Sequence, residues 1–472
     1  MSLEDEMFAQ RRSRVAEVEA LGFRGYGQRF DFTHTVTQVL AEYSPKTAEE
    51  LVDRPRVKLA GRIMTIRRMG KAGFMHLMQA GERLQVYVRK DGVSERDYKL
   101  YEILDMGDIV GVEGYVFRTR TGELSIHVDT LTFLSKILMT LPEKFHGLED
   151  VELRYRQRYL DLIANADSQK VFMTRAKIVS SLRRQLEERG FVEVETPMMQ
   201  AVYGGATARP FVTHHNTLDI DLYMRIAPEL YLKRLIVGGL DRVYEINRNF
   251  RNEGISTHHN PEFTMLEFYQ AYTDYRGLMD LTVEMLKRTA LDATGSTVVQ
   301  YQGQELDFGN VRRMSMQEAV GDMTLFGDAL VHAFEAKVEP MLFQPTIIYD
   351  YPVEVSPLSK RREDDPRFVE RFEIYAAGME IGNAYTELND PAEQCSRFLM
   401  QLDRKAAGDE EAHQMDEDYL RAMSYGMPPT GGEGIGIDRL TMILTDCKSI
   451  RDVILFPLLR PEGGIGMVEK LR

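Results

Sequence analysis

The sequence predicts an α+β fold in two parts: a five-stranded β-barrel near the N-terminus and a larger domain of antiparallel strands flanked by helices. Between residues 56 and 140, apolar residues alternate with a period of two, which indicates short strands. Beyond residue 166, segments with helical spacing alternate with further strands. The chain has 472 residues, too many for one ordinary core, so two or three domains are expected.

Composition is typical of a soluble globular protein, with 43% hydrophobic and 28% charged residues. The net charge of −14 argues against non-specific nucleic-acid binding, because such binding depends on lysine and arginine contacts with phosphates. A nucleic-acid partner would therefore need a local basic patch. Residues 62–71 (RIMTIRRMGK) supply one.

The cysteine content and the N-terminus bear on the compartment. Cys395 and Cys447 supply neither a disulfide framework nor the CxxC spacing of a zinc site, which favours a reducing compartment. Residues 1–14 are charged and lack the apolar segment of a signal peptide. No uninterrupted apolar run is long enough to span a bilayer. We therefore expect a cytoplasmic protein with no membrane partner.

Four segments are predicted along the chain. Residues 1–55 form a helical extension with apolar residues spaced by three and four. Residues 56–140 contain strands separated by Gly-Lys, Gly-Glu and Thr-Gly turns, close to the five strands of an OB-fold, although another small barrel such as an SH3-like module has a similar pattern. A passage rich in proline, glycine and charge, residues 141–165, is the expected linker to a domain at 166–472.

The first helix of the second domain is predicted from MTRAKIVSSLRRQLEERG, which places Ile178, Leu182 and Leu186 on one stripe and ends at Gly190. The next segment, FVEVETPMM, is a predicted strand that ends at Pro197.

The stretch RNFRNEGISTHHNPEFTMLEFY, residues 248–269, is predicted to form two strands around a polar loop. Alternation places Phe263, Met265, Glu267 and Tyr269 on one face of the second strand. Burying ions such as Arg251 is unfavourable without a partner, so this hairpin indicates a charged ligand. The alternative is an internal ion pair between Arg251 and Glu267.

A second hairpin, RFEIYAAGMEIGNAYTELND, carries Glu373, Glu380, Asn383 and Glu387 among apolar residues. Two carboxylates across a tight turn fit a Mg²⁺ site, because that ion shares its ligands between a few protein oxygens and substrate phosphates. Exposed surface glutamates are the alternative. Glu380 and Glu387 alternate to opposite faces in a regular strand, so a bulge or kink at Gly382 is needed if both serve one site.

Two further segments carry glycines beside charged residues. In GGEGIGIDRLTMILTD, glycines lead into a helix predicted to be capped by Asp438, with Arg439 in its first turn; simple tight packing is the alternative. After YGGATARPF, which contains Gly204 and Gly205, Glu229 opens a helix directly behind a proline, where an ordinary first-turn glutamate would also be favourable.

Together these segments resemble the three signatures of class II aminoacyl-tRNA synthetases. FRNEGISTHHNPEF resembles the second, GIGIDR the third, and the helix, strand and proline around FVEVETP the first. With YRQRYLDL, GGATARPF, IAPELYLKRL, YPVEVSPLSKR, GNAYTELND and IRDVILFP, the chain is similar to the lysyl-tRNA synthetase family from about residue 4 to 460.

The resemblance implies ATP-dependent activation of L-lysine to an adenylate, followed by transfer to tRNA(Lys), with Arg251 and Arg439 as the catalytic residues. It implies that ATP is bound by Arg251, Glu253, His258, His259, Phe263, Glu373, Gly436 and Arg439. Lysine would be bound by Gly204, Gly205, Glu229, Arg251, Glu267, Tyr269, Asn383 and Glu387. The implied cofactor is Mg²⁺, held by Glu373 and Glu380.

For the barrel, the resemblance implies recognition of a uridine-rich anticodon, with base stacking on Phe74. The residues implied to read base edges or backbone are Arg67, Gln85 and Glu123. Packing of Phe74 in the barrel core is the alternative. The family also forms homodimers through its first signature, which contains Pro197.

The sequence departs from the family at His258, where many bacterial members have arginine, and at residues 300–345, a segment shorter than most members carry. Two alternatives remain. An aspartyl- or asparaginyl-tRNA synthetase shares the barrel and the signatures but needs a cation facing the substrate side chain, where this sequence offers Glu267 and Glu387. The second alternative is a catalytically idle paralogue, which only the shortened segment supports.

Overall fold

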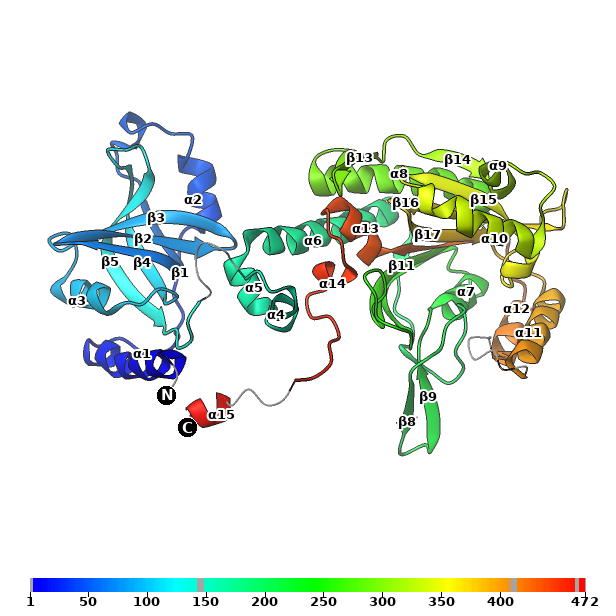
Figure 1. The fold of residues 1–472 in the computed structure, drawn as a ribbon, viewed down its shortest axis with the longest axis horizontal. Helices are drawn as coiled ribbons and strands as arrows, with labels where there is room; N and C mark the ends of the chain where they lie inside the picture. The colour runs from blue at the N-terminus through cyan, green and yellow to red at the C-terminus, as the bar shows by residue number, and fades with distance from the viewer. Residues whose placement is uncertain (1–2, 142–147, 407, 409–413, 463–466, 472) are drawn as a thin grey trace. The chain divides into compact units, whose positions relative to one another are not determined.

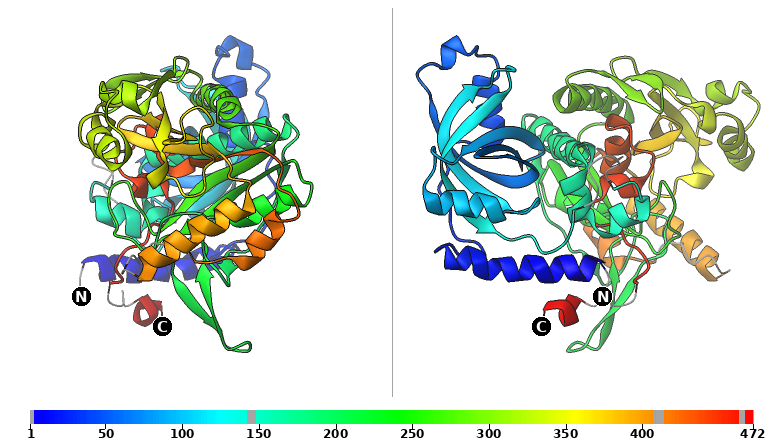
Figure 2. Two further views of the ribbon diagram at one scale, coloured as in Figure 1. Left: turned by 90° about the vertical axis from the view of Figure 1, so that its right-hand side faces the viewer. Right: turned by 60° about the vertical axis from the view of Figure 1, so that its left-hand side comes forward.

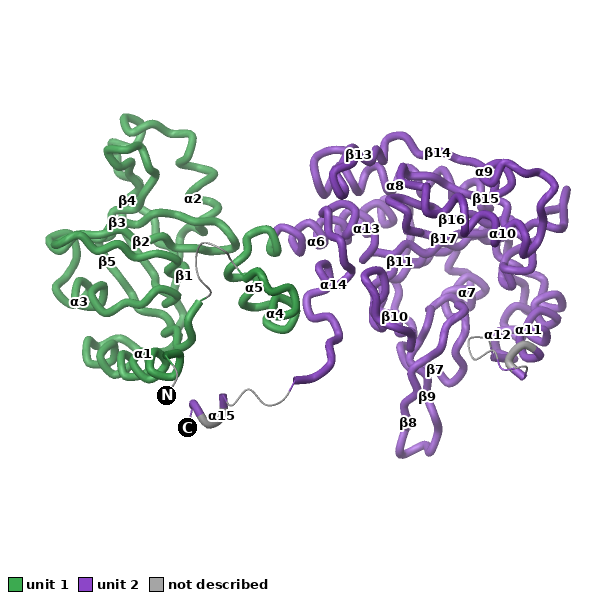
Figure 3. Tube along the Cα trace, in the orientation of Figure 1, with its two compact units in different colours: residues 1–169 green, residues 170–472 purple. Residues whose placement is uncertain are grey.

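The computed structural model describes residues 3–141, 148–406, 408, 414–462 and 467–471. The chain forms two compact units, Met1–Gln169 and Lys170–Arg472 (Figure 3). Part of the expected linker, residues 142–147, lies outside the described residues. The rest of that passage contains helices α4 (Val151–Arg156) and α5 (Arg158–Ala164).

The first unit contains the predicted five-stranded barrel, closed in the order β1-β2-β3-β5-β4. The strands are β1 (Arg56–Met69), β2 (Ala72–Gln79), β3 (Glu82–Arg89), β4 (Ile109–Arg118) and β5 (Leu124–Ser135). The helical extension consists of α1 (Leu3–Ala20), α2 (Val36–Tyr43) and η1 (Glu49–Leu51). Helix α3 (Glu95–Ile103), between β3 and β4, was not predicted, and Ser94 caps it through the Asp97 amide.

The second unit is built on an eight-stranded sheet in the order β14-β15-β16-β17-β18-β11-β10-β6. Its strands are β14 (Arg312–Ser315), β15 (Thr346–Pro352), β16 (Phe368–Ala376), β17 (Met379–Thr386), β18 (Thr430–Gly436), β11 (Glu262–Ala271), β10 (Arg242–Phe250) and β6 (Val192–Glu193). Strands β15 to β10 are antiparallel as predicted, whereas the outer pairs β14/β15 and β10/β6 are parallel, so the sheet is mixed.

One face of this sheet is covered by helices α6 (Ala166–Glu187), α8 (Tyr275–Thr294) and α13 (Ile437–Leu444) (Figure 1). The predicted stripe Ile178, Leu182 and Leu186 is confirmed, since all three are fully buried there. The even-numbered residues of β11, Leu266 and Phe268, join the same core. The odd-numbered residues of β11 therefore face the other side of the sheet, where α7 (Glu229–Val237) packs.

Two local predictions in this unit need correction. The strand predicted between Gly190 and Pro197 is present but shorter than expected, since β6 covers only two residues; β7 (Met199–Gln200) follows the proline and belongs to a separate sheet with β9. Asp438 does not cap α13: Gly436 is the N-cap residue, and Asp438 accepts a hydrogen bond from the Thr264 amide at 2.7 Å. That bond and an ion pair with Arg175 (2.6 Å) tie α13 to β11 and α6.

The second unit has further elements besides the large sheet and the helices that cover it. Strands β8 and β9 form a hairpin that extends away from the sheet (Figures 1 and 2). These elements are β8 (Val212–His215), β9 (Ile220–Met224), β12 (Val298–Tyr301), β13 (Gln304–Asp307), α9 (Met316–Val320), α10 (Gly327–Lys337), η2 (Glu339–Met341), η3 (Val353–Val355), α11 (Pro391–Ala406), α12 (Glu417–Met423), α14 (Ile450–Val453) and α15 (Met467–Leu471). Within the segment predicted to be short, Met316, Leu330 and Phe334 belong to a small apolar cluster that also includes residues of β15 and β16.

Candidate active site

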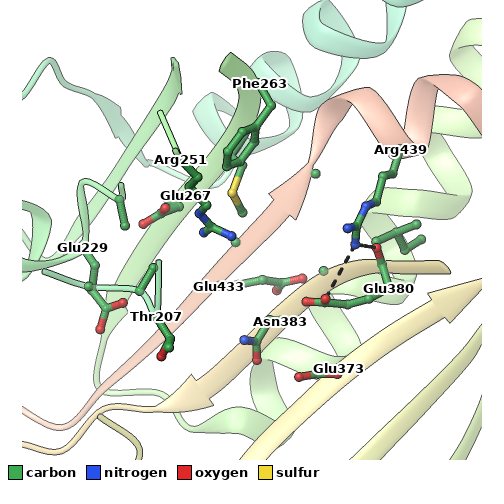
Figure 4. A pocket seen from close by; sticks show the side chains of 18 of the residues that line it. Thr207, Glu229, Arg251, Phe263, Glu267, Glu373, Glu380, Asn383, Glu433 and Arg439 are labelled. Atoms are coloured by element: carbon green, nitrogen blue, oxygen red, sulfur yellow. Dashed lines mark hydrogen bonds and ion pairs between the residues drawn. The ribbon is translucent and has the colours of Figure 1, made fainter. Parts of the chain in front are cut away.

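A cavity of about 390 Å³ lies on the sheet face opposite α8 and α13. Its size suits a small ligand. Figure 4 shows Glu229 and Thr207 at one end, Arg439 and Glu380 at the other, and Arg251 between them. The predicted residues that line it are Gly205, Glu229, Arg251, Glu253, His258, His259, Phe263, Glu267, Tyr269, Glu373, Glu380, Asn383, Gly436 and Arg439. Gly204 and Glu387 are not among its lining residues.

Arg251 is the unpaired cation of the cavity. The expected alternative, an ion pair with Glu267, is wrong: in the described part of the chain no carboxylate lies within 4.0 Å of the Arg251 guanidinium, and its buried Nε has no hydrogen-bond partner. Its guanidinium lies 5.0 Å from the ring centroid of Phe263, within cation–π range. Burial lowers the pKa of Arg251. An anionic ligand would supply the missing counter-charge.

Arg439 is positioned at the other end by α13. Its Nη1 donates to the Glu380 carbonyl oxygen (2.7 Å) and lies 3.6 Å from the Glu380 carboxylate. Its Nη2 lies 3.3 Å from His259 Nε2, and the other ring nitrogen of His259, Nδ1, lies 2.9 Å from Ser256 Oγ. Arginine can only donate, so His259 Nε2 accepts and Nδ1 carries the proton. Burial and the Arg439 charge lower the pKa of both His258 and His259, which keeps the imidazoles neutral.

Arg371 on β16 organises the carboxylate at the centre of the sheet and was not identified from the sequence. It forms an ion pair with Glu373 and donates from Nε to Asn383 Oδ1 at 3.1 Å. Because the amide oxygen faces Arg371, the Asn383 amide nitrogen is left to donate to an anion. Glu373 also accepts from Tyr351 at 2.9 Å and is buried, so the interpretation of Glu373 as a surface residue is wrong.

A bulge re-aims Glu380, as the sequence required. The pairing of β16 with β17 shifts so that Ile374 faces Gly382 while the adjacent Tyr375 faces Glu380, leaving Ile381 as the extra residue. The irregularity therefore precedes Gly382 by one residue. It brings Glu380 onto the same side as Asn383 and Tyr385, and all three line the cavity.

Glutamates dominate the end of the cavity nearest α7. Glu229 follows Pro228 at the start of α7, and Gly205, with φ +88°, approaches it so closely that a Cβ would lie 2.8 Å from Glu229 Cβ. Tyr269 donates to Glu267 Oε2 at 3.3 Å. Burial, with the nearby charge of Glu229, raises the pKa of Glu267 to about 8. These groups form a pocket that favours a cationic ligand group.

Glu387 departs from its expected setting, because a lysine of the protein itself is bound to it. Lys233 on α7 has a fully buried side chain, lies 2.5 Å from Glu229 Oε1 and forms an ion pair with Glu387 Oε2. Burial alone would lower the pKa of Lys233, but the two carboxylates raise it above its usual range. Sequence reasoning missed Lys233. The spacing of Glu229 and Lys233 by four residues on one helix was the available signal.

The barrel carries an aromatic row on its outer face. The row consists of partly exposed rings on four strands: Phe74, Tyr87, His127, Tyr115 and Phe117. The ring centroids of Phe74 and Tyr87 are 4.9 Å apart, and Tyr115 stacks on His127 at 4.8 Å. Packing of Phe74 in the core is therefore the wrong interpretation, since the buried residues of β2 are its neighbours Met75 and Leu77.

The other predicted barrel residues lie around this row. Arg67 is exposed and directly opposite Phe74 in the β1–β2 ladder, which places the two on one face. Gln85 lies on the face of Tyr87 and accepts from Ser125 Oγ at 2.8 Å. Glu123 is exposed in the turn between β4 and β5. Partly exposed rings bordered by polar side chains suit the stacking of nucleic-acid bases.

The edge of the large sheet exposes apolar residues near Pro197. Pro197 itself is exposed, and Val192, Met198 and Met199 are 50%, 46% and 55% exposed. Within the described residues, no helix combines the length and apolar character that crossing a membrane requires.

Comparison with known proteins identifies the family of the chain. Residues 150–460 match the family model of class II tRNA synthetases (D, K and N), and residues 57–134 match that of the OB-fold nucleic acid binding domain. A lysine-tRNA ligase of Pelotomaculum thermopropionicum is 52% identical over 97% of this chain and 95% of its own. Those of Staphylococcus haemolyticus and Staphylococcus aureus are 51% and 50% identical, over 95% and 97% of this chain and 97% and 99% of their own. The chain therefore belongs to the class II tRNA synthetases of the D, K and N group, with an OB-fold domain at its N-terminal side.

Proposed function

We propose that the protein joins L-lysine to ATP, forming lysyl-adenylate and pyrophosphate, and transfers the lysyl group to the 3′ end of tRNA(Lys). The observation that carries this proposal is the polarity of one cavity. Glutamates and a tyrosine lie at one end, and the unpaired Arg251 lies at the centre beside the open ring face of Phe263. A diamino acid attached through its carboxylate to a nucleotide phosphate has the complementary charge distribution.

The reaction needs little acid–base chemistry from the protein, because the carboxylate of lysine is already a nucleophile. Arg251 would bind that carboxylate and the α-phosphate, stabilising the charge that grows on the phosphate oxygens in the transition state. Phe263 would stack on adenine, Arg439 and His259 would bind near it, and Asn383 would donate its amide to the lysine carboxylate. Holding the two reactants in line supplies much of the rate.

The Mg²⁺ expected with ATP fits the carboxylates at the Arg439 end. Among the described residues no group of three or more His, Cys, Asp or Glu could hold a metal alone, so Glu373 and Glu380 would share the ion with phosphate oxygens, as is usual for Mg²⁺. Burial and the charge of Glu373 raise the pKa of Glu380 to about 7 even though Arg439 lies 3.6 Å away, so a bound cation would favour the ionised carboxylate. When bound, the ion would neutralise phosphate charge.

At the α7 end, Glu229 with the Gly205 backbone would bind the α-ammonium, and Glu267 and Tyr269 would contact the ε-ammonium. Gly204 is buried and would support this loop rather than contact lysine. In the barrel, Phe74 would stack an anticodon base, and Arg67, Gln85 and Glu123 would contact base edges or backbone.

Activation of aspartate or asparagine is the second candidate, because the matching family model covers the enzymes for these amino acids and Lys233 places a cation near the pocket. That cation is already neutralised by two carboxylates, so an acidic substrate side chain would meet Glu267 instead. A catalytically idle paralogue is disfavoured because Arg251, Arg439, Glu373 and Glu380 all line one cavity.

The test is amino-acid-dependent exchange of labelled pyrophosphate into ATP by the purified protein with Mg²⁺. We expect exchange with lysine and none with aspartate, asparagine or no amino acid. Exchange driven by aspartate or asparagine would reject lysine as the substrate. No exchange with any of these amino acids, in protein that is folded, would favour the idle paralogue.

We also infer that the protein acts as a cytoplasmic homodimer. The exposed apolar residues around Pro197 at the sheet edge support pairing of two copies there, since such patches usually mark interfaces. Met199→Glu should therefore shift the mass in sedimentation from dimer to monomer. A dimeric variant would place the interface elsewhere. A monomeric wild type would reject the homodimer.

A further inference from the structure

Lys233 has no role in the function proposed above, yet it forms ion pairs with Glu229, which that function assigns to the α-ammonium, and with Glu387. It lies one helical turn after Glu229 on α7, and its ammonium is shared between Glu229 and Glu387. Glu387 comes from the segment directly after β17, on a different part of the sheet. One buried ammonium therefore fixes the relative position of two elements that meet at the lysine end of the cavity.

Each carboxylate keeps one oxygen that this contact does not use. On Glu229, Oε1 accepts from both Lys233 (2.5 Å) and Tyr385 (2.7 Å), whereas Oε2 lies on the Gly205 side, 3.6 Å from the position of a Cβ on that glycine. On Glu387, Oε2 pairs with Lys233, and the buried Oε1 has no hydrogen-bond partner. A buried oxygen without a donor is unfavourable and indicates a missing partner.

The free oxygen of Glu387 is buried directly behind Gly432, a residue that lines the cavity. A Cβ on Gly432 would lie 2.1 Å from Glu387 Oε1 and 2.4 Å from the Tyr269 ring, so only glycine permits this approach. Gly432 and Tyr269 both line the cavity. A donor that entered beside Tyr269 would reach Glu387 from the side opposite Lys233.

The charges balance only with Lys233 included. The groups at the lysine end are the carboxylates of Glu229, Glu267 and Glu387 and the cations of Lys233 and Arg251. In the complex, with all of these groups ionised, their charges sum to −1, and lysine, with two ammonium groups and one carboxylate, contributes +1. Loss of Lys233 would leave a buried negative charge in the complex, which is strongly unfavourable.

We propose that Lys233 is a positioning residue that holds Glu229 and Glu387 at a fixed separation, so that one free oxygen of each receives one ammonium group of the substrate. This inference rests on the proposed function and adds a specificity device to it. The separation of the two carboxylates measures the length of the diamino acid. Lysine spans it, and ornithine, one methylene shorter, reaches only one carboxylate at a time.

The test compares Lys233→Met with Lys136→Met. Lys136 is a matched control in the barrel: its side chain is also fully buried, between Asp105 (2.5 Å) and Asp108 (2.8 Å). Pyrophosphate exchange gives KM for lysine and for ATP, and the ratio of kcat/KM for lysine over ornithine. For Lys233→Met we expect KM for lysine to rise at least tenfold, KM for ATP to stay within twofold, and the lysine-to-ornithine ratio to fall at least fivefold.

The control separates positioning from general stability. Lys136→Met should lower Tm yet leave both KM values and the selectivity ratio within twofold. Equal rises in KM for lysine and ATP in Lys233→Met, or an unchanged selectivity ratio, would overturn the proposal. Absence of lysine-dependent exchange in the wild type would instead reject the proposed function itself.

Should Lys233→Met not fold, Lys233→Arg carries the test. It keeps the positive charge but replaces a point-like ammonium with a wider planar fork, which would move the two carboxylates apart. We expect it to fold, keep KM for ATP within twofold and lose at least threefold in lysine-to-ornithine selectivity. Wild-type selectivity in this variant would overturn the fixed separation.

Discussion

The two binding regions of this protein use opposite chemistry. On the barrel, the aromatic row is made of partly exposed rings that already contact one another without a ligand. In the cavity of the second unit, buried ionisable groups face one another, and several have strongly shifted pKa values. Stacking surfaces need no counter-charge, whereas buried charges do.

Each region should therefore be sensitive to a different kind of substitution. The barrel face should lose affinity gradually as rings are removed, because each ring contributes a separate stacking contact. The cavity should fail abruptly, because removing one charge leaves its counterparts unbalanced in a site shielded from water. The predictions below test this contrast, in order of decreasing effect.

Arg251→Ala should have the largest effect. It removes the unpaired guanidinium that is expected to stabilise charge on the α-phosphate, and the loss of such a group lowers rates by about 10²- to 10³-fold. Arg248, three residues earlier on β10, is exposed and serves as the control, so Arg248→Ala should stay within twofold of wild type. Pyrophosphate exchange with lysine measures both. A fall of less than threefold in Arg251→Ala would remove the arginine from the reaction.

Glu267→Gln should weaken lysine binding and remove its pH dependence. With a pKa of about 8, Glu267 is protonated below pH 8 in the empty cavity, so binding of a cation has to expel that proton. In the wild type, affinity for lysine should therefore rise by up to about tenfold per pH unit as pH increases toward 8, then level off. In the variant, KM for lysine should not change with pH. At pH 8 it should be roughly 10- to 150-fold higher than in the wild type, which is the effect of losing a hydrogen bond to a charged group. A pH profile of KM for lysine between 6.5 and 8.5 measures this, and a wild-type profile without a slope would contradict it.

Phe74→Ala should have a moderate effect confined to tRNA. Base stacking on an aromatic ring contributes about 1–3 kcal/mol, so KM for tRNA in aminoacylation should rise about tenfold. Exchange without tRNA should remain within twofold, because the ring belongs to the first unit. Phe32, which is also exposed in that unit but outside the aromatic row, provides the control variant Phe32→Ala. Equal effects of the two substitutions would show that the row has no special role.

The sequence predicted those features that depend on strand alternation. The shared face of Phe263, Met265, Glu267 and Tyr269 follows from the period of a pleated strand, and all four line the cavity. The same counting predicted a bulge at Gly382 if Glu380 and Glu387 serve one site; the bulge is present one residue earlier, although Glu387 does not line the cavity. These inferences use only residues close in the chain.

The errors concern partners that lie far apart in sequence. Glu387 was assigned to the substrate alone because nothing near it in the chain indicates Lys233, which tertiary packing brings to it. Asp438 was interpreted as a cap from its position, but packing of α13 on β11 gives it the Thr264 amide instead. Arg371 was overlooked for another reason: its partner Asn383 lies on the other strand of the same hairpin, but alternation gives the face of a side chain and not the residue to which it bonds across the ladder. Residue spacing predicts which face a side chain occupies, but not which distant group it meets.

Glu433→Gln should have the smallest effect on activity and sharpens the contrast within the second unit. Burial raises the pKa of Glu433 to about 8, as for Glu267, and residue 433 borders the cavity, but its carboxylate is bonded to Thr282 on α8. The Thr282 hydroxyl lies 2.7 Å from the Leu278 carbonyl oxygen and 2.6 Å from Glu433 Oε2. The hydroxyl has one proton and can donate it to only one of these oxygens, so when it donates to Leu278, a protonated Glu433 donates to the hydroxyl oxygen.

Unfolded glutamate has a pKa of about 4.3, so between that value and pH 8 the folded state holds a proton that the unfolded state releases. As pH rises through this range, the free energy of unfolding of the wild type should therefore fall by up to about 1.4 kcal/mol per pH unit relative to that of the variant. Tm of the two should agree at pH 5, Glu433→Gln should be higher at pH 8, and KM for lysine should stay within twofold. A rise in KM like that of Glu267→Gln would mean that Glu433 also faces the ligand, and that a raised carboxylate pKa in this unit marks binding rather than burial alone.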